Sequence, residues 1–229
     1  MKLQRFFVKN KAKVGEDLVV ADPSLSHQLS RVFRMKAGES VILFDGDGFE
    51  YVSTIGALRK DGAVFHIVES SPSIAFPSVT LHLYPTLIKK DKLEWVLQKA
   101  TELGVASFHP VIADRSEKKG FDIERAQKII KEAAEQSAWG RVPEIFKLEK
   151  LEMAIENAEN PIVLDGNFAA PMFSKLAKTM SVFVGPEGGW SDAEKEYFSA
   201  RRIPIVSLGA QTLRAETASV AVASLLNFL

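Results

Sequence analysis

The chain has 229 residues, of which 46% are hydrophobic and 25% are charged. Its 29 basic and 29 acidic residues give a formal net charge of zero. This is ordinary globular composition, long enough for one large domain or two smaller ones. There is no cysteine, which excludes disulfides, thiolate zinc sites and a cysteine nucleophile. No apolar run approaches the ~20 residues that span a bilayer. We expect no signal peptide and a soluble cytoplasmic protein.

The first third of the chain is expected to be mostly β. Strands are expected at 4–9, at 16–20, on both sides of the turn Asp45-Gly46-Asp47-Gly48, and at 63–70. Between them, apolar residues at helical spacing predict a helix over 23–34. These elements predict a small β-barrel-like module that carries one helix. The stretch 70–78, with two prolines and four serines, is predicted to be the linker.

From residue 79 onward, strand patterns alternate with helix patterns. Strands are expected at 79–85, 106–113, 161–165, 181–185 and 203–209, and helices at 92–103, at 122–139, from 191 and from 219. Asp91 and Asp122 are the predicted N-caps of the first two helices, and Gly104 and Gly140 follow their ends. Short apolar strands that alternate with helices predict a parallel sheet covered on both faces.

Three glycine-bearing loops follow strands in this second part: Asp165-Gly166-Asn167, the segment 185–189 (GPEGG), and the segment 208–218 (LGAQTLRAETA). Ligands of open parallel sheets bind beyond the carboxyl ends of the strands, and glycines let backbone groups approach them closely. Ser191 and Glu194 form a capping-box pattern, which leaves 185–190 as a true loop. A tight turn and a ligand loop both remain open for GPEGG alone. The three loops together favour one pocket.

Further motifs, present or missing, limit which ligands and catalytic groups the sequence supports. The P-loop and dinucleotide fingerprints are both missing. The four histidines are isolated in sequence, without metal-ligand spacing, so we predict no metal. Arg214 is either a solvated loop charge or a cation that reaches an electron-rich substrate edge. Glu216, two residues later, suits a helix N-terminus.

The helix predicted over 122–139 places Glu135 and Trp139 on its polar side, opposite a stripe of apolar and small residues. A tryptophan that faces solvent is costly. We therefore favour an interface with a neighbouring segment or subunit over a ligand site at this helix.

Six motifs occur in an order that resembles one family. They are "RFF" (5–7), "HQLSRVFRMKAGESVILFDGDGFEY" (27–51), "KKDKLEWVLQKATELGV" (89–105), "EAAEQSAWGRVPEI" (132–145), "GPEGG" (185–189) and "LRAETA" (213–218). The chain resembles the SPOUT methyltransferases, and more narrowly those that methylate N3 of uridine 1498 in bacterial 16S rRNA. The match covers nearly the whole chain.

This resemblance implies an N-terminal PUA-like RNA-binding barrel (1–72) and a C-terminal α/β methyltransferase domain (73–229). The second domain would fold as a trefoil knot, form a homodimer and bind S-adenosylmethionine. Its cofactor pocket would be made by Leu83, Tyr84, Pro85, Leu164, Asp165, Gly166, Gly185, Pro186, Glu187, Gly188, Gly189, Leu208, Gly209, Thr212 and Leu213. RNA of the 30S subunit would be contacted by Arg5, His27, Arg31, Arg34, Lys89, Lys90, Arg115 and Arg141.

Methyl transfer to uracil N3 requires in-line approach, a cation near the uracil oxygens and a proton acceptor. We expect Arg214 to be the cation and Glu216 to be a candidate base, with a helix-cap role as the alternative. The absence of cysteine argues against C5 methylation through a covalent adduct. The chain departs from the family's usual pattern at Ala138-Trp139 and Gln211-Thr212-Leu213, which bears on RNA contacts.

Two rival functions remain at this point. One is a SPOUT methyltransferase that modifies the ribose 2′-oxygen of another RNA, because such an enzyme shares the GPEGG pocket. The other is a non-catalytic RNA-binding factor of ribosome assembly that has kept the fold.

Overall fold

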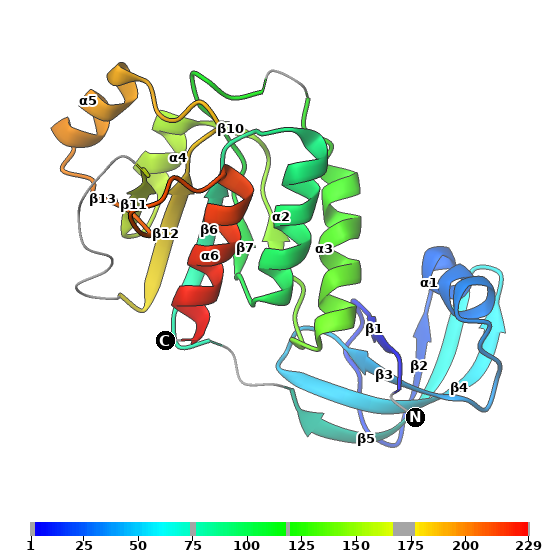
Figure 1. Ribbon diagram of the computed structural model, residues 1–229. Coiled ribbons are helices and arrows are strands. Elements are labelled where there is room, and N and C mark those ends of the chain that lie inside the picture. Colours follow the sequence, from blue (N-terminus) through cyan, green and yellow to red (C-terminus); the bar gives the residue numbers. More distant parts are fainter. Residues whose placement is uncertain (1–2, 74–76, 118–119, 167–176, 229) are drawn as a thin grey trace. The chain divides into compact units, whose positions relative to one another are not determined.

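The computed structural model describes residues 3–73, 77–117, 120–166 and 177–228 (Figure 1). The chain separates into two compact units. The first consists of Met1–Ala75 together with Ala134–Val142, and the second of Phe76–Ala133 together with Pro143–Leu229. Within the described ranges, no helix has the length and apolar character needed to cross a membrane.

The first unit contains a five-stranded sheet in the order β1-β3-β4-β5-β2. Its strands are β1 (Arg5–Phe7), β2 (Asp17–Val20), β3 (Ser40–Phe44), β4 (Phe49–Arg59) and β5 (Gly62–Pro72). β1 pairs parallel with β3, and the other pairs are antiparallel. The predicted hairpin turn lies between β3 and β4, with Gly46 and Gly48 at positive φ. The linker prediction is wrong at its start, because β5 continues through Pro72; residues 74–76 lie outside the described residues.

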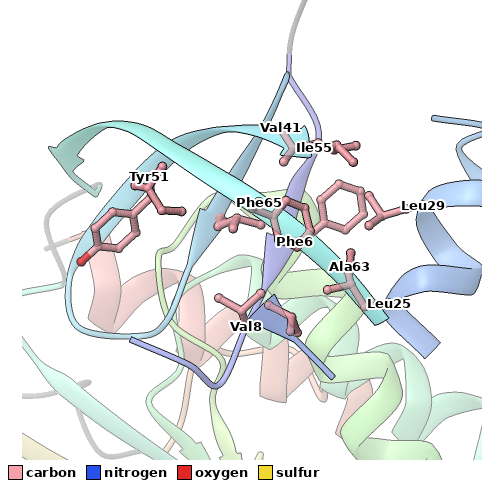
Figure 2. Close-up of a cluster of buried hydrophobic side chains, with 12 residues drawn as sticks. Phe6, Val8, Leu25, Leu29, Val41, Tyr51, Ile55, Ala63 and Phe65 are labelled. Carbon is pink, nitrogen blue, oxygen red and sulfur yellow. The ribbon is translucent and has the colours of Figure 1, made fainter. Parts of the chain in front are cut away.

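A helical segment packs on this sheet. Asp22 caps α1 (Pro23–His27) by accepting from the backbone amides of Ser24 and Leu25, and a π-helical turn, η1 (Gln28–Val32), continues it. The predicted helix over 23–34 is therefore confirmed in place, although its second half is π-helical and Arg34 has a positive φ of 55°. Figure 2 shows the buried side chains of Phe6, Phe65 and Leu29 gathered between strands and this segment.

The C-terminal part of α3 (Ile123–Ser137) and the residues after it belong to the first unit. Glu135 is only 7% exposed. Its carboxylate accepts the backbone N–H of Phe7 at 3.0 Å and the amide of Gln28 at 3.0 Å. The prediction of a polar helix face at Glu135 is therefore wrong, because the carboxylate satisfies a strand amide and a side-chain amide in the interior.

The second unit is built on a six-stranded sheet in the order β13-β11-β12-β6-β7-β9. The strands are β6 (Thr80–Pro85), β7 (Ser107–Phe108), β9 (Glu144–Ile145), β11 (Pro161–Leu164), β12 (Thr179–Val184) and β13 (Ile205–Val206). Every pairing is parallel, as the sequence predicts. β8 (Val111–Ile112) pairs instead with β10 (Glu149–Lys150). The single strand predicted over 106–113 is therefore two strands, one on each side of Pro110.

Helices cover both faces of this sheet (Figure 1). α2 (Lys90–Glu102) contacts α6 (Ala215–Phe228), and α6 lies on β6 and β12. On the opposite face, α4 (Leu151–Asn157) and α5 (Asp192–Ala200) pack over side chains of β11 and β12. This apolar packing supplies most of the stability of such short helices.

Two predicted helix starts need correction. α2 begins at Lys90, two residues earlier than the sequence suggests, so Asp91 lies in its first turn and Lys89 is the N-cap. α6 begins at Ala215, not 219, because Ala218 already donates to the carbonyl of Arg214. Two other predictions are confirmed: Gly104 follows the end of α2 at a positive φ, and Ser191 and Glu194 form a complete capping box at α5.

A row of four stacked rings crosses the carboxyl end of the sheet on the α4 side. Tyr84 stacks on Phe183 and on His109, with ring centroids 4.2 and 4.4 Å apart, and His109 stacks on Phe146 at 4.2 Å. Nε2 of His109 lies 2.8 Å from the hydroxyl of Ser107. Burial, together with the nearby His82, lowers the pKa of His109 to about 4. The ring is therefore neutral at physiological pH.

Candidate functional site

A cavity of about 560 Å³ lies at the carboxyl ends of β11, β12 and β13, beside the N-terminal ends of α2 and α6. Its volume falls within the ~300–1,000 Å³ typical of small-molecule sites. The cavity is lined by Lys89, Lys92, Leu164, Asp165, Gly166, Val184, Gly185, Pro186, Glu187, Gly188, Gly189, Trp190, Val206, Ser207, Leu208, Gln211, Thr212, Leu213, Arg214, Ala215 and Ala218.

The structure brings the three glycine-bearing loops together around this cavity. Of the fifteen residues predicted to bind a cofactor, Leu83, Tyr84, Pro85 and Gly209 do not line it. Tyr84 instead lies in the stacked row of rings beneath, and Leu83 is fully buried. Asn167 lies outside the described residues.

The segment 185–190 forms a preorganised wall. Gly185 carries no side chain because a Cβ there would lie 2.9 Å from Cε2 of Trp190. The Trp190 ring is buried, and its Nε1 donates to the carbonyl of Leu164 at 2.8 Å, which ties this wall to the neighbouring loop. Gly189 has a φ of +68° and donates to the carbonyl of Pro186 at 2.8 Å. Residue 189 is glycine because this left-handed backbone conformation is unfavourable for residues with a Cβ.

The segment 113–116, just after β8, braces the outer side of the wall. Nη1 of Arg115 donates to the carbonyls of Gly188 at 2.9 Å and Trp190 at 3.4 Å. The backbone N–H of Asp114 donates to Glu194 at 2.9 Å, inside the α5 capping box. Arg115 was predicted to contact RNA. The structure directs its guanidinium to loop carbonyls, so its observed contacts are structural.

Charged side chains are distributed unevenly around the cavity. Lys89, Lys92 and Arg214 come from the N-terminal ends of α2 and α6, whereas Asp165 and Glu187 come from the loops after β11 and β12. The guanidinium of Arg214 has no hydrogen-bond or ion-pair partner within the described part of the chain, and the side chain is exposed. Such a cation is free to meet an anionic group of a ligand.

Two ion pairs at the cavity were missed from sequence. Nζ of Lys92 lies 3.3 Å from Glu216, and Nζ of Lys195 lies 3.5 Å from Asp165. Glu216 is 6% exposed and is absent from the cavity lining. One signal in the sequence could have pointed to Lys92. It is the third lysine within four residues at the start of a predicted helix, and positive charge is unfavourable at a helix N-terminus.

The cations predicted to meet RNA differ in their environments. Lys90 is exposed and lies 4.0 Å from Glu94. In the first unit, Arg5 donates to both carboxylate oxygens of Glu50, at 2.9 and 3.3 Å. Arg141 is partly buried, and desolvation lowers its pKa.

His27, Arg31 and Arg34 are exposed around the α1–η1 segment. Val32 and Phe33 are exposed beside them. Of the first-unit residues predicted to contact RNA, these three are the exposed ones, whereas Arg5 and Arg141 are partly buried. In the part of the chain that the structure covers, no cluster of three or more His, Asp or Glu side chains could hold a metal ion.

Comparison with known proteins gives the family. Residues 76–227 match the model of an RNA methyltransferase domain, and residues 29–68 match that of an RNA methyltransferase PUA domain. Two solved structures align over 99% of this chain. One is a ribosomal RNA small subunit methyltransferase E from Neisseria gonorrhoeae bound to S-adenosyl methionine (26% identity, 98% of that chain, TM-score 0.91). The other is a Legionella pneumophila methyltransferase, Lpg2936, with bound SAM (27%, 97%, TM-score 0.88).

Curated relatives carry the same name. The ribosomal RNA small subunit methyltransferase E of Bacillus subtilis is 30% identical over 99% of this chain and 96% of its own length. That of Aquifex aeolicus is 33% identical over 93% of this chain and 94% of its own length. The chain thus belongs to the ribosomal RNA small subunit methyltransferase E family.

Proposed function

We propose that this protein transfers a methyl group from S-adenosylmethionine to N3 of uridine 1498 in the 16S rRNA of the small ribosomal subunit. The carrying observation is a cavity at the carboxyl end of a parallel sheet, walled by three glycine-bearing loops and lined also by Arg214, whose guanidinium has no partner among the described residues. The relatives that match over nearly their whole length are rRNA small subunit methyltransferases. Both solved structures described above hold S-adenosylmethionine.

The residues of the cavity fit S-adenosylmethionine. At Gly185 a Cβ would meet Trp190, and at Gly188 a Cβ would lie 3.4 Å from the side chain of Arg115, so both positions leave bare backbone at the wall. Glu187 and Asp165 supply carboxylates suited to a positively charged ligand. When bound, the cofactor supplies an electrophilic methyl group on a positively charged sulfur.

In this proposal the chain itself orients the uracil, excludes water and stabilises charge. N3 becomes a nucleophile as its proton leaves, and negative charge then spreads to the uracil oxygens. Arg214, which lines the cavity, is the cation proposed to meet that charge. The backbone of 185–190, fixed by Trp190 and Arg115, holds its position without reorganising.

We further propose the finer architecture that the resemblance implies. Residues 1–72 form a PUA-like barrel that binds RNA, residues 73–229 form a SPOUT domain with a trefoil knot, and two copies form a homodimer in the cytoplasm. The exposed His27, Arg31 and Arg34 serve as RNA contacts of the barrel, and Lys89 and Lys90 as contacts near the target. The bounds of the two family models, 29–68 and 76–227, support this division.

Mass spectrometry of nucleosides tests the function. Purified 30S subunits from cells that lack this protein are incubated with the protein and S-adenosylmethionine, and 3-methyluridine is expected to appear at position 1498. The appearance of a ribose-methylated nucleoside instead would establish the 2′-O-methyltransferase alternative. No modification and no calorimetric binding of S-adenosylmethionine, alone or with 30S subunits, would favour a non-catalytic assembly factor.

A further inference from the structure

Lys92 and Glu216 form an ion pair beside the cavity. The methyl transfer proposed above assigns no role to this pair. Their charged atoms are 3.3 Å apart, with the lysine side chain 38% and the glutamate side chain 8% exposed. Lys92 is one of the residues that line the cavity, whereas Glu216 is not. Among the described residues, Oε2 of Glu216 is buried without a hydrogen-bond partner.

This arrangement is locally unfavourable. Lys92 sits in the first turn of α2, where the helix dipole opposes positive charge, and Lys89 at the N-cap offers no side-chain hydrogen bond. A buried carboxylate oxygen without a donor is costly as well. Local rules are most often broken where a site requires it. The result here is one ammonium fixed at the cavity edge by a carboxylate that solvent barely reaches.

The charges of the cavity suggest what this ammonium meets. Lys89, Lys92 and Arg214 lie on the side of the helix ends, and Asp165 and Glu187 lie on the side of the strand loops. Asp165 is already paired with Lys195. A positively charged sulfur is favoured on the acidic side. A uracil that develops negative charge is favoured on the cationic side.

We propose that Lys92 is a catalytic cation that contacts a carbonyl oxygen of the target uracil, and that Glu216 is the positioning residue which holds it there. In this step the N3 proton leaves to solvent, N3 bonds to the methyl carbon, and the electron pair of the broken bond stays on sulfur. Lys92 and Arg214 share the stabilisation of the charge on the uracil oxygens. The inference rests on the proposed function and replaces the sequence prediction that Glu216 is the base.

Four variants test it by single-turnover methylation of 30S subunits: Lys92→Met, Lys92→Arg, Glu216→Gln and the double variant Lys92→Met/Glu216→Gln. Lys92→Met is expected to slow methylation about 100-fold, as for loss of one preorganised donor. S-Adenosylmethionine affinity, measured by calorimetry, stays within about 3-fold, as for a contact made only in the transition state. The defect shrinks as pH rises, because hydroxide removes the N3 proton without help. Lys92→Arg recovers most of the rate because it restores the charge.

Glu216→Gln is expected to slow methylation about 10-fold, and the double variant is no slower than Lys92→Met, because the two residues act as one unit. The double variant also removes the buried unpaired carboxylate that Lys92→Met leaves, so thermal unfolding separates a folding defect from a catalytic one. Lys99→Met is the matched control. Lys99 pairs with Glu102 at 2.8 Å on the same helix, outside the cavity lining, and its loss should leave the rate unchanged.

Three results would overturn the inference. A larger loss in Glu216→Gln than in Lys92→Met, with losses that multiply in the double variant, would make Glu216 an independent base. Weakened cofactor binding in Lys92→Met at an unchanged rate would assign Lys92 to the cofactor. An unchanged pH profile would make the pair structural. Failure of the wild-type protein to form 3-methyluridine would instead refute the proposed function.

Discussion

Two walls of the same cavity are built in opposite ways. The segment 185–190 is held by a buried tryptophan, by the guanidinium of Arg115 and by the α5 capping box. The segment 209–214 is exposed, and the hydroxyl of the neighbouring Ser207 makes two local hydrogen bonds with the Gly209 backbone, at 2.7 and 3.4 Å. The first wall offers fixed backbone, and the second offers side chains, among them Arg214.

The difference separates two tasks. A fixed wall loses little entropy when a ligand binds, which suits recognition of a cofactor that must always sit in one orientation. A segment with few contacts has low local stability and can adjust when a substrate arrives. We therefore expect changes in the fixed wall to alter cofactor affinity, and changes in the exposed segment to alter the rate of transfer.

Arg214→Ala is the strongest test of the exposed segment. Removing this cation is expected to lower the rate of methylation about 100- to 1,000-fold, as for loss of a preorganised transition-state donor. Cofactor affinity should change by no more than a few-fold, because Arg214 is not part of the fixed wall. Single-turnover assays and calorimetry measure the two quantities. Retention of the wild-type rate would leave Arg214 as a solvated loop charge.

Gly185→Ala tests the fixed wall. The new Cβ would lie 2.9 Å from the Trp190 ring, and we expect a loss of about 1–3 kcal/mol in stability from overpacking. Cofactor affinity should fall in parallel because the ring anchors the wall to Leu164. Gly166→Ala is the control, since its Cβ would meet Thr212 at an ordinary 3.6 Å. Equal effects of the two variants on denaturant unfolding would contradict this reading.

Arg115→Met tests whether the hydrogen bonds of Arg115 to the segment 185–190 support cofactor binding or whether Arg115 binds RNA. The variant loses two hydrogen bonds from a charged donor to loop carbonyls, and we expect cofactor binding to weaken by about 1–2 kcal/mol. Affinity for 30S subunits, measured by filter binding without cofactor, should not change. A weaker affinity for subunits with unchanged cofactor affinity would support the predicted RNA contact of Arg115.

We expect the free energy of unfolding to decrease at acid pH because of His109, whose ring lies in the stacked row on the sheet. The pKa of His109 falls from 6.5 to about 4 on folding, so between these values the unfolded chain binds the extra proton and stability decreases as pH falls. Because the ring is only partly buried, we expect a loss of about 1–2 kcal/mol over this interval. His109→Phe keeps the stacking and should flatten this pH dependence in urea unfolding. An equally steep dependence in the variant would assign the loss to other groups.

Local patterns were sufficient where a single segment decides its own conformation. The capping box at Ser191, the glycine turn before β4 and the end of α2 at Gly104 were predicted and confirmed. Patterns failed where a distant residue intervened. Glu135 reads as a polar helix position, but strand and side-chain amides far away in sequence supply its partners. The RNA contact of Arg115 stays a prediction, but its observed acceptors lie more than seventy residues later, and no local pattern indicates them.

The sequence by itself determined the alternation of strands and helices, the glycine-bearing loops at strand ends and, through six ordered motifs, the family. These features depend on short-range spacing and turn chemistry, which one segment carries alone. Only the tertiary structure decided that three loops share one cavity, that Tyr84 faces the core and not this cavity, and that Lys92 is held by Glu216. Such contacts depend on the order of strands in the sheet, and no local pattern encodes which side chains that order brings together.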